Sequence, residues 1–375
     1  MTVAAVAPAE GGRIGTRALL LLAALAAVAA VALFVGARFG MLLAVGLGFG
    51  VVLEGLRFGF AGPWRAMILR REPAGILAQL LAIALVAVVA IPLIAAHPGE
   101  IGGAQAPIGW AMLGGAFVFG AAMQLVLGCG SGTLVNAGSG NPVSLLALPF
   151  FAIGSFAGAY HLIWWTNLGA LPILTLGGLP GLAVTLVGLA VLAAIFLWRA
   201  APGTRAIPGR YLLAAVLLAA LAVANLVIAG QPWGVVYGLG LWAAKGFVAL
   251  GGDLSGSAFF AAPGSVARVQ GSILTDYTSL TDIGLIAGAF GVAAWRRGAL
   301  AAPLPRYPAR AWVATVIAGL ALGYSSRLAF GCNVGAFFSG IATGSLHGWA
   351  WFAMAFAGAF VGIWLRPRLG LEARA

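Results

Sequence analysis

The sequence contains few charged residues. Of its 375 residues, 7% are Asp, Glu, Lys or Arg and 62% are hydrophobic, and the mean hydropathy is +1.08. Apolar runs recur along the whole length, which excludes a soluble globular protein and indicates a polytopic membrane protein. The 20 Lys and Arg outnumber the 8 Asp and Glu, but most of them fall in or beside breaks between apolar runs, as in positively charged cytoplasmic loops. The basic balance therefore indicates orientation in a lipid bilayer and no nucleic-acid partner.

Cysteine and histidine are also scarce. The chain has 2 Cys, Cys129 and Cys332, and 3 widely scattered His. Two cysteines provide neither a disulfide framework nor a four-ligand zinc site. The sequence has no CxxC pair, no haem- or flavin-like motif and no P-loop. We therefore expect no metal, no cofactor, no catalytic residues and no enzymatic activity.

Apolar runs of about 20 residues, long enough to cross a bilayer, predict an all-α fold. We expect about nine to eleven hydrophobic segments, near residues 18–36, 40–56, 74–96, 108–127, 142–165, 181–198, 211–229, 232–251, 281–295, 311–329 and 345–365. The first reads as an uncleaved anchor. Polar or glycine-rich stretches between them suit backbone that is buried in protein or faces a water-filled cavity. They lie at 57–71, 128–141, 251–282 and 331–345.

The two cysteines occupy equivalent positions of an internal repeat. Aligning them, 203 residues apart, superposes the residues that frame each one: Gly120 on Gly323, Gln124 on Arg327, Gly128 on Gly331, and Gly132 on Gly335. Each motif is followed by an apolar helix with a Gly-x-x-x-Gly pair, at Gly154 and Gly158 or at Gly358 and Gly362. We predict a single transmembrane domain over residues 1–375, made of two halves at roughly 15–200 and 205–370.

Arginines indicate that the two halves are inverted. Arg70 and Arg71 precede the helix that leads to the first cysteine unit, whereas Arg306 and Arg310 stand directly before the helix that enters the second. By the positive-inside rule, the two units enter the membrane from opposite sides. Inverted repeats with broken or re-entrant helices are typical of many secondary transporters. The repeat and the arginine-containing loop at 199–210 disagree about one crossing, so the number of crossings stays open.

The cysteine units have the composition of an anion pathway. Glycines let a helix break and let backbone approach a ligand, and the half-helix that follows presents unpaired N–H groups and a positive end. A cysteine there adds a polarizable sulfur and a weak S–H donor. We predict a substrate pathway lined by Cys129, Cys332, Gly128, Gly130, Gly331, Asn333, Gly335 and Arg327.

Other roles are open for several of these residues. The glycines would also allow close helix packing, and Asn333 would also serve as a helix cap. Arg327 would snorkel or pair with a carboxylate if it does not bind substrate. An acidic residue in or beside a membrane segment, such as Asp276 or Asp282, is either a proton relay or half of a structural ion pair.

Three motifs resemble one known family. The run from Arg327 to Ile363, which contains FGCNVG, resembles the hallmark of the YeeE/YedE sulfur-transport family. LGCGSGTL at 127–134 resembles its companion motif, and RFGFAG at 57–62 resembles a third segment. The resemblance implies a multi-pass protein of the bacterial inner membrane that takes up thiosulfate or a related small sulfur-containing anion. It also implies an hourglass of inverted repeats in which cysteines relay the anion through S–H···S contacts.

Carried onto this chain, the resemblance makes Cys129 the central relay cysteine and Cys332 the relay cysteine on the cytoplasmic side. Many members have a further cysteine in the third segment, where this chain has Gly59, so that step would use another donor or a different substrate. The resemblance also suggests a cytoplasmic sulfurtransferase-type, TusA-like partner. Transport of a selenium compound and a membrane thiol-redox function are the alternatives.

Overall fold

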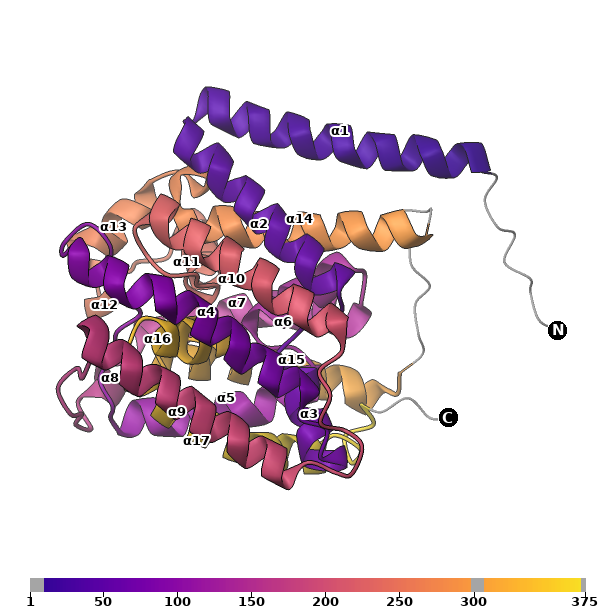
Figure 1. The fold of residues 1–375 in the computed structure, drawn as a ribbon. Coiled ribbons are helices and arrows are strands. Elements are labelled where there is room, and N and C mark those ends of the chain that lie inside the picture. The colour runs from indigo at the N-terminus through magenta and orange to yellow at the C-terminus, as the bar shows by residue number, and fades with distance from the viewer. Residues whose placement is uncertain (1–9, 298–306, 372–375) are drawn as a thin grey trace.

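The computed structural model describes residues 10–297 and 307–371 and shows a bundle of helices (Figure 1). No strand occurs within these ranges. The ten segments long and apolar enough to cross a membrane are eight continuous helices and two broken ones. The continuous helices are α1 (Glu10–Phe34), α2 (Ala37–Gly55), α4 (Ala74–Ala96), α7 (Pro142–Tyr160), α9 (Gly178–Arg199), α10 (Gly209–Ala229), α14 (Tyr277–Arg297) and α17 (His347–Leu365). This confirms the predicted all-α polytopic membrane protein.

Each broken helix carries one of the cysteines at its break. The first consists of α5 (Trp110–Val126) and α6 (Gly130–Gly138). The second consists of α15 (Ala309–Leu328), the π-helical turn η2 (Asn333–Phe338) and α16 (Ser339–Ala342). The predicted helix breaks at the cysteine motifs are therefore confirmed.

The segment expected near 232–251 forms α11 (Val236–Ala249). Its 14 residues span about 21 Å at 1.5 Å per residue, which is less than the hydrocarbon core of about 30 Å. The chain leaves α10 and begins α14 at the same end of the bundle, because Gln231 and Thr278 line one cavity there. Of the expected hydrophobic segments, the one near 232–251 is therefore too short to cross, whereas α9 before the loop at 199–210 is long enough.

Short helices fill the ends of the bundle. They are α3 (Ala61–Arg70), α8 (Leu162–Thr166), α12 (Ala258–Ala261), α13 (Pro263–Gln270) and the 3-10 turn η1 (Ile273–Thr275). Helix α1 lies along the outside against α2 and α14 (Figure 1). Its side chains are mostly exposed, as expected for a helix that faces lipid.

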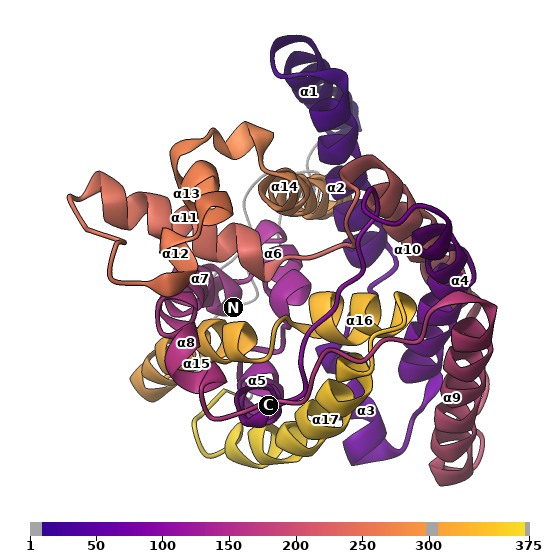
Figure 2. The same ribbon diagram turned by 90° about the vertical axis from the view of Figure 1, so that its left-hand side faces the viewer.

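Glycines pack the first helix of each cysteine unit against the last helix of the other unit. In α5, a Cβ atom at Gly120 would lie 1.9 Å from the carbonyl oxygen of Ala355 in α17. In α15, a Cβ atom at Gly323 would lie 2.1 Å from the carbonyl oxygen of Phe151 in α7. The Gly-x-x-x-Gly pairs make the reciprocal contacts. Gly358 and Gly362 of α17 contact the backbone of α5, and Gly154 and Gly158 of α7 contact the backbone of α15. Both helix pairs run side by side in Figure 2.

This packing leaves no room for a methyl group at Gly120. We expect Gly120→Ala to lower stability by about 1–3 kcal/mol, the usual effect of overpacking, because backbone atoms of α17 cannot move aside cheaply. Gly114, two turns earlier in α5, has open space around its Cα atom, so Gly114→Ala should be neutral or stabilising by helix propensity. Thermal unfolding of both purified variants in detergent measures the difference. Equal melting temperatures would contradict the observed α5–α17 packing.

Candidate functional site

The two helix breaks have the same backbone geometry. Leu127 and Phe330, which are 203 residues apart, both adopt a left-handed conformation with φ of +52° and +56°. The next residue in each unit is a glycine whose N–H donates back into the preceding helix. The carbonyl of each cysteine then accepts the N–H four residues ahead, at 2.9 Å for Cys129 and 2.8 Å for Cys332. The two breaks, at positions that the sequence alignment makes equivalent, therefore share one local backbone geometry.

Gly128 and Gly331 are required by the turns themselves. A Cβ atom at Gly128 would lie 2.8 Å from the amide nitrogen of Thr133, and one at Gly331 would lie 2.7 Å from that of Ala336. Both contacts are with backbone, so neither position can accept a side chain without opening the break. Gly335, in contrast, has open space around it and lines a cavity beside Cys332.

Each cysteine is the N-cap of the half-helix that follows it. Both thiols are free and completely buried. The Cys129 sulfur accepts the N–H of Gly132 at 3.5 Å and lies 3.3 Å from the hydroxyl oxygen of Ser131. The hydroxyl of Thr133 donates to the Cys129 carbonyl at 2.8 Å. The positive ends of two half-helices therefore converge on positions occupied by polarizable, uncharged side chains.

The two cysteine units touch each other at Gly130. A Cβ atom at this glycine would lie 2.8 Å from the sulfur of Cys332. The sulfur of the second unit thus packs directly on the first turn of α6, next to Cys129. The structure brings together the cysteines that the sequence placed 203 residues apart.

Cys332 lines a cavity of about 330 Å³, here called the Cys332 pocket. Its lining includes Gln105, Trp233, Arg268, Thr278, Cys332 and His347. Trp233 and His347 are buried, and neither the indole nitrogen nor the imidazole Nε2 has a hydrogen-bond partner among the described residues. A buried polar atom without a partner costs about 1–3 kcal/mol, so these atoms are suited to a polar ligand.

Asn333 is also buried without a partner. Neither its amide nitrogen nor its amide oxygen is hydrogen-bonded within the described ranges, and the N-cap position of η2 belongs to Cys332. The structure therefore assigns Asn333 no capping role. Its amide provides one donor group and one acceptor beside the Cys332 sulfur.

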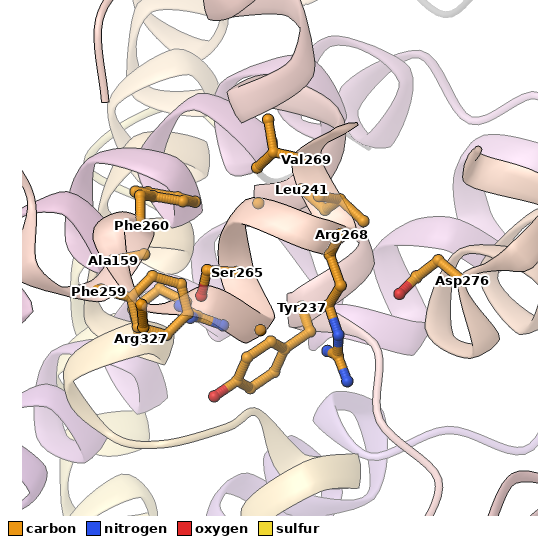
Figure 3. A pocket seen from close by; sticks show the side chains of 13 residues that line it. Ala159, Tyr237, Leu241, Phe259, Phe260, Ser265, Arg268, Val269, Asp276 and Arg327 are labelled. Carbon is orange, nitrogen blue, oxygen red and sulfur yellow. The ribbon is translucent and has the colours of Figure 1, made fainter. Parts of the chain in front are cut away.

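Arg327 lies in a neighbouring cavity of about 250 Å³ (Figure 3). Its guanidinium stacks on two rings, with centroids 3.9 Å away at Tyr237 and 4.8 Å away at Phe259. The guanidinium thus has aromatic partners, and no ion pair with a carboxylate is formed by Arg327 among the described residues. Tyr237 and Arg268 line this cavity as well as the Cys332 pocket, so the two spaces adjoin.

A second large cavity, here called the Gly59 pocket, lies at the opposite end of the bundle. It measures about 610 Å³, and its lining includes Arg57, Gly59, Arg70, Glu72, Asn136 and Arg210. Ala74 and Arg210, which line it, lie at the starts of α4 and α10, whereas the Cys332 pocket lies beyond the ends of the same two helices. The carbonyl of Gly59 is fixed by the side-chain amide of Gln79, which in turn accepts the indole N–H of Trp64.

Arginines concentrate at the end with the Gly59 pocket. The arginines that line this pocket or contact residues near it are Arg57, Arg70, Arg71, Arg199, Arg210, Arg296 and Arg297. By the positive-inside rule we expect this end to face the cytoplasm. With that orientation the Cys332 pocket would face the opposite side, whereas the family resemblance implies a cytoplasmic position for Cys332, so the two expectations differ.

Sequence reasoning did not find Arg268. It lies on α13 and lines the Cys332 pocket, the cavity of Figure 3 and a third cavity of about 270 Å³. A signal was present in the repeat, because Arg65 on α3 lies 203 residues earlier. It was overlooked because the residues around the two arginines differ.

Comparison with known proteins identifies the family. A family model described as "Sulphur transport" matches residues 56–361. The chain belongs to this family. The probable transporter YedE of Escherichia coli (strain K12) is 37% identical over 106 residues, which are 28% of this chain and 25% of that protein. The YedE of Salmonella typhimurium is 36% identical over 104 residues, 28% of this chain and 24% of that protein.

A longer match is found to the thiosulfate transporter TsuA of Spirochaeta thermophila. It is 28% identical over 259 residues, which are 63% of this chain and 71% of that protein. The chain spans only about a quarter of the length of the two YedE proteins that it matches. The comparisons confirm the YeeE/YedE family that three motifs had indicated, and its members are transporters rather than enzymes.

The contact between Gly130 and Cys332 makes a testable prediction. Gly130→Ala should lower the melting temperature, because its methyl group would overlap the Cys332 sulfur. Adding Cys332→Ala should restore part of the loss by removing the sulfur. Gly132→Ala is the matched control, because its methyl group would lie at an ordinary 3.7 Å from Cys129. Additive effects of the two changes in the double variant would show that the residues do not touch.

Orientation can be tested by single-cysteine labelling. Asn167 and Ala206 are exposed residues before and after α9, and both native cysteines are buried. In intact cells, we expect a membrane-impermeant maleimide to label Asn167→Cys, since it lies at the end with the Cys332 pocket. Ala206→Cys should react only after the cells are opened. The reverse labelling pattern would place the Gly59 pocket outside.

Proposed function

We propose that this protein carries thiosulfate, or a related small sulfur-containing anion, across the bacterial inner membrane. The observation that carries the proposal is the contact of two cysteine-capped helix starts between cavities at opposite ends of the bundle. The named thiosulfate transporter among its relatives supports the choice of substrate.

The route begins in the Cys332 pocket on the outer side. Arg268 attracts the anion there, and the unpartnered indole N–H of Trp233 replaces part of its hydration. The unpartnered amide of Asn333, the residue after Cys332, replaces more of it as the anion reaches the cysteine. The anion passes from Cys332 to Cys129 and leaves through the Gly59 pocket. Buried, uncharged thiols serve this purpose as weak S–H donors, whereas thiolates would repel a dianion.

In this proposal the two halves are inverted repeats, related by a pseudo-twofold axis that lies in the membrane plane. The reciprocal pairing of α5 with α17 and of α15 with α7 supports it. The matching backbone geometry at the two breaks supports it as well. Opposed half-helix starts at one midplane site are the arrangement expected of such repeats.

Uptake of a dianion needs a source of free energy. Moving two negative charges inward against 100 mV costs about 4.6 kcal/mol, at about 2.3 kcal/mol per charge. Consumption of the anion by a cytoplasmic sulfurtransferase-type, TusA-like protein would supply this by keeping its internal concentration low. The basic rim of the Gly59 pocket, formed by Arg57, Arg70 and Arg210, is where such a protein would receive it.

Uptake of labelled thiosulfate by proteoliposomes that contain only this protein tests the function. Cys129→Ala should abolish uptake and Cys332→Ala should reduce it severely. Cys129→Ser should retain little, because its shorter side chain holds the hydroxyl oxygen too far from the ligand sulfur. All three variants should fold, since each replaces a buried thiol by a group of similar or smaller size.

Two outcomes would reject the relay, and a third would reassign the substrate. Full uptake by Cys129→Ala would show that its thiol is dispensable. A stable persulfide or S-thiosulfonate adduct on Cys129 during turnover would favour the thiol-redox alternative. Selenium oxyanions that are taken up in preference to thiosulfate would favour the selenium alternative.

A further inference from the structure

Asp282 is a carboxylate buried inside a membrane-spanning helix. It lies in α14 and is completely shielded from solvent. Neither carboxylate oxygen has a hydrogen-bond partner within the described residues. An ionised carboxylate without partners is very unfavourable in such a place, so the group keeps its proton instead.

Among the described residues, no cation pairs with this carboxylate from the helices packed around α14. On α11, Gly238 lies so close that a Cβ atom there would be 2.5 Å from a carboxylate oxygen, and Lys245 donates instead to the carbonyls of Val269 and Gly271. On α2, Arg38 donates to the carbonyl of Ile228, and Glu54 pairs with Arg296.

The remaining charged or titratable neighbours also offer no countercharge. Asp276 at the start of α14 and Cys332 of the second cysteine unit lie within electrostatic range of Asp282. On α6, the N-cap Cys129 is the ionisable side chain. On α1, the guanidinium of Arg17 stacks over the ring of Trp295. Each of these groups either is uncharged, repels a carboxylate or is engaged elsewhere.

Asp282 nevertheless lies close to the route. Thr278, one helical turn earlier on α14, lines the Cys332 pocket. On α11, Val236 lines the same pocket and Gly238 contacts the carboxylate. The carboxyl group is therefore buried one turn of α14 away from the Cys332 pocket, which Cys332 also lines.

We propose that Asp282 binds a proton that crosses the membrane together with the anion. This inference rests on the proposed function and adds its coupling ion. The anion occupies the site beside Cys332 while the carboxyl O–H is intact. The O–H bond then breaks, its proton moves inward with the anion, and a proton from the outer cavity restores the carboxyl. One proton per dianion halves the charge moved against the membrane potential.

Proteoliposomes with an internal pH dye and labelled thiosulfate test this coupling, with the membrane potential clamped at zero. In the wild type, thiosulfate addition should acidify the interior. An inward gradient of one pH unit should raise steady-state accumulation about tenfold for one coupled proton. Asp282→Asn, which is permanently neutral, should still exchange internal for external thiosulfate but should show neither acidification nor dependence on the pH gradient.

Asp253→Asn is the matched control, because Asp253 is exposed in the loop after α11 and should behave as the wild type. Wild-type uptake without acidification, or acidification that persists in Asp282→Asn, would overturn the coupling alone. Absence of any thiosulfate uptake by the wild type would instead reject the proposed function, and the coupling with it.

A measurement on the wild type does not depend on how the variant folds. An apolar carbodiimide modifies protonated carboxyl groups in apolar surroundings and spares ionised ones. Peptide mass spectrometry should find the adduct on Asp282 and not on Asp253, and thiosulfate uptake should fall as the adduct accumulates. Full uptake by protein that is completely modified at Asp282 would contradict a proton-carrying role.

Discussion

Breaking a helix within a bilayer leaves backbone N–H and C=O groups that lipid cannot satisfy. Two such breaks lie at the centre of this protein, and the rest of the bundle is arranged to bury them. Hydrogen bonds from Gly128 and Gly331 close the carbonyl side of the breaks. The N–H groups on the other side face cysteines, a buried amide and a cavity. The same backbone groups that make a break costly make it useful for an anion.

Reciprocal helix packing holds the breaks together. Because α5 packs on α17 and α15 packs on α7, each cysteine unit depends on the other half of the chain for its position. At these crossings a glycine of one helix lies against a backbone carbonyl oxygen of the other, and such close packing holds the two helices together. The cavities consequently lie at the two ends of the bundle, and the two units meet between them.

Buried ionisable groups are accommodated in two different ways. Arg327 keeps its charge by stacking on Tyr237 and Phe259, and an arginine cannot shed its proton in a protein. Asp282 has no such partner but can become neutral, which is the less costly state for an isolated carboxyl group. In the proposed mechanism, the fixed positive charge of Arg327 would attract a dianion and the exchangeable proton of Asp282 would assist its transport, each beside one of two adjoining cavities.

The sequence by itself determined the membrane class, the positions of the helices, the breaks at both cysteines and the family. Hydropathy, glycine spacing and motif order are local properties, and membrane insertion enforces them strongly. The equivalence of Cys129 and Cys332 was likewise readable from the 203-residue repeat. Local patterns, however, left open whether the segment near 232–251 crosses, whether Asn333 is a cap and whether Arg327 pairs with a carboxylate.

Only the tertiary structure decided those questions, because each depends on residues distant in sequence. The Cys332 sulfur rests on Gly130, Arg327 stacks on Tyr237, and Arg268 reaches the Cys332 pocket from a separate short helix. The pocket also lies at the end of the bundle opposite the arginine cluster. Hydropathy measures how a segment partitions into lipid, whereas a partner for a buried charge and the end to which a cavity opens are set by how the helices pack together.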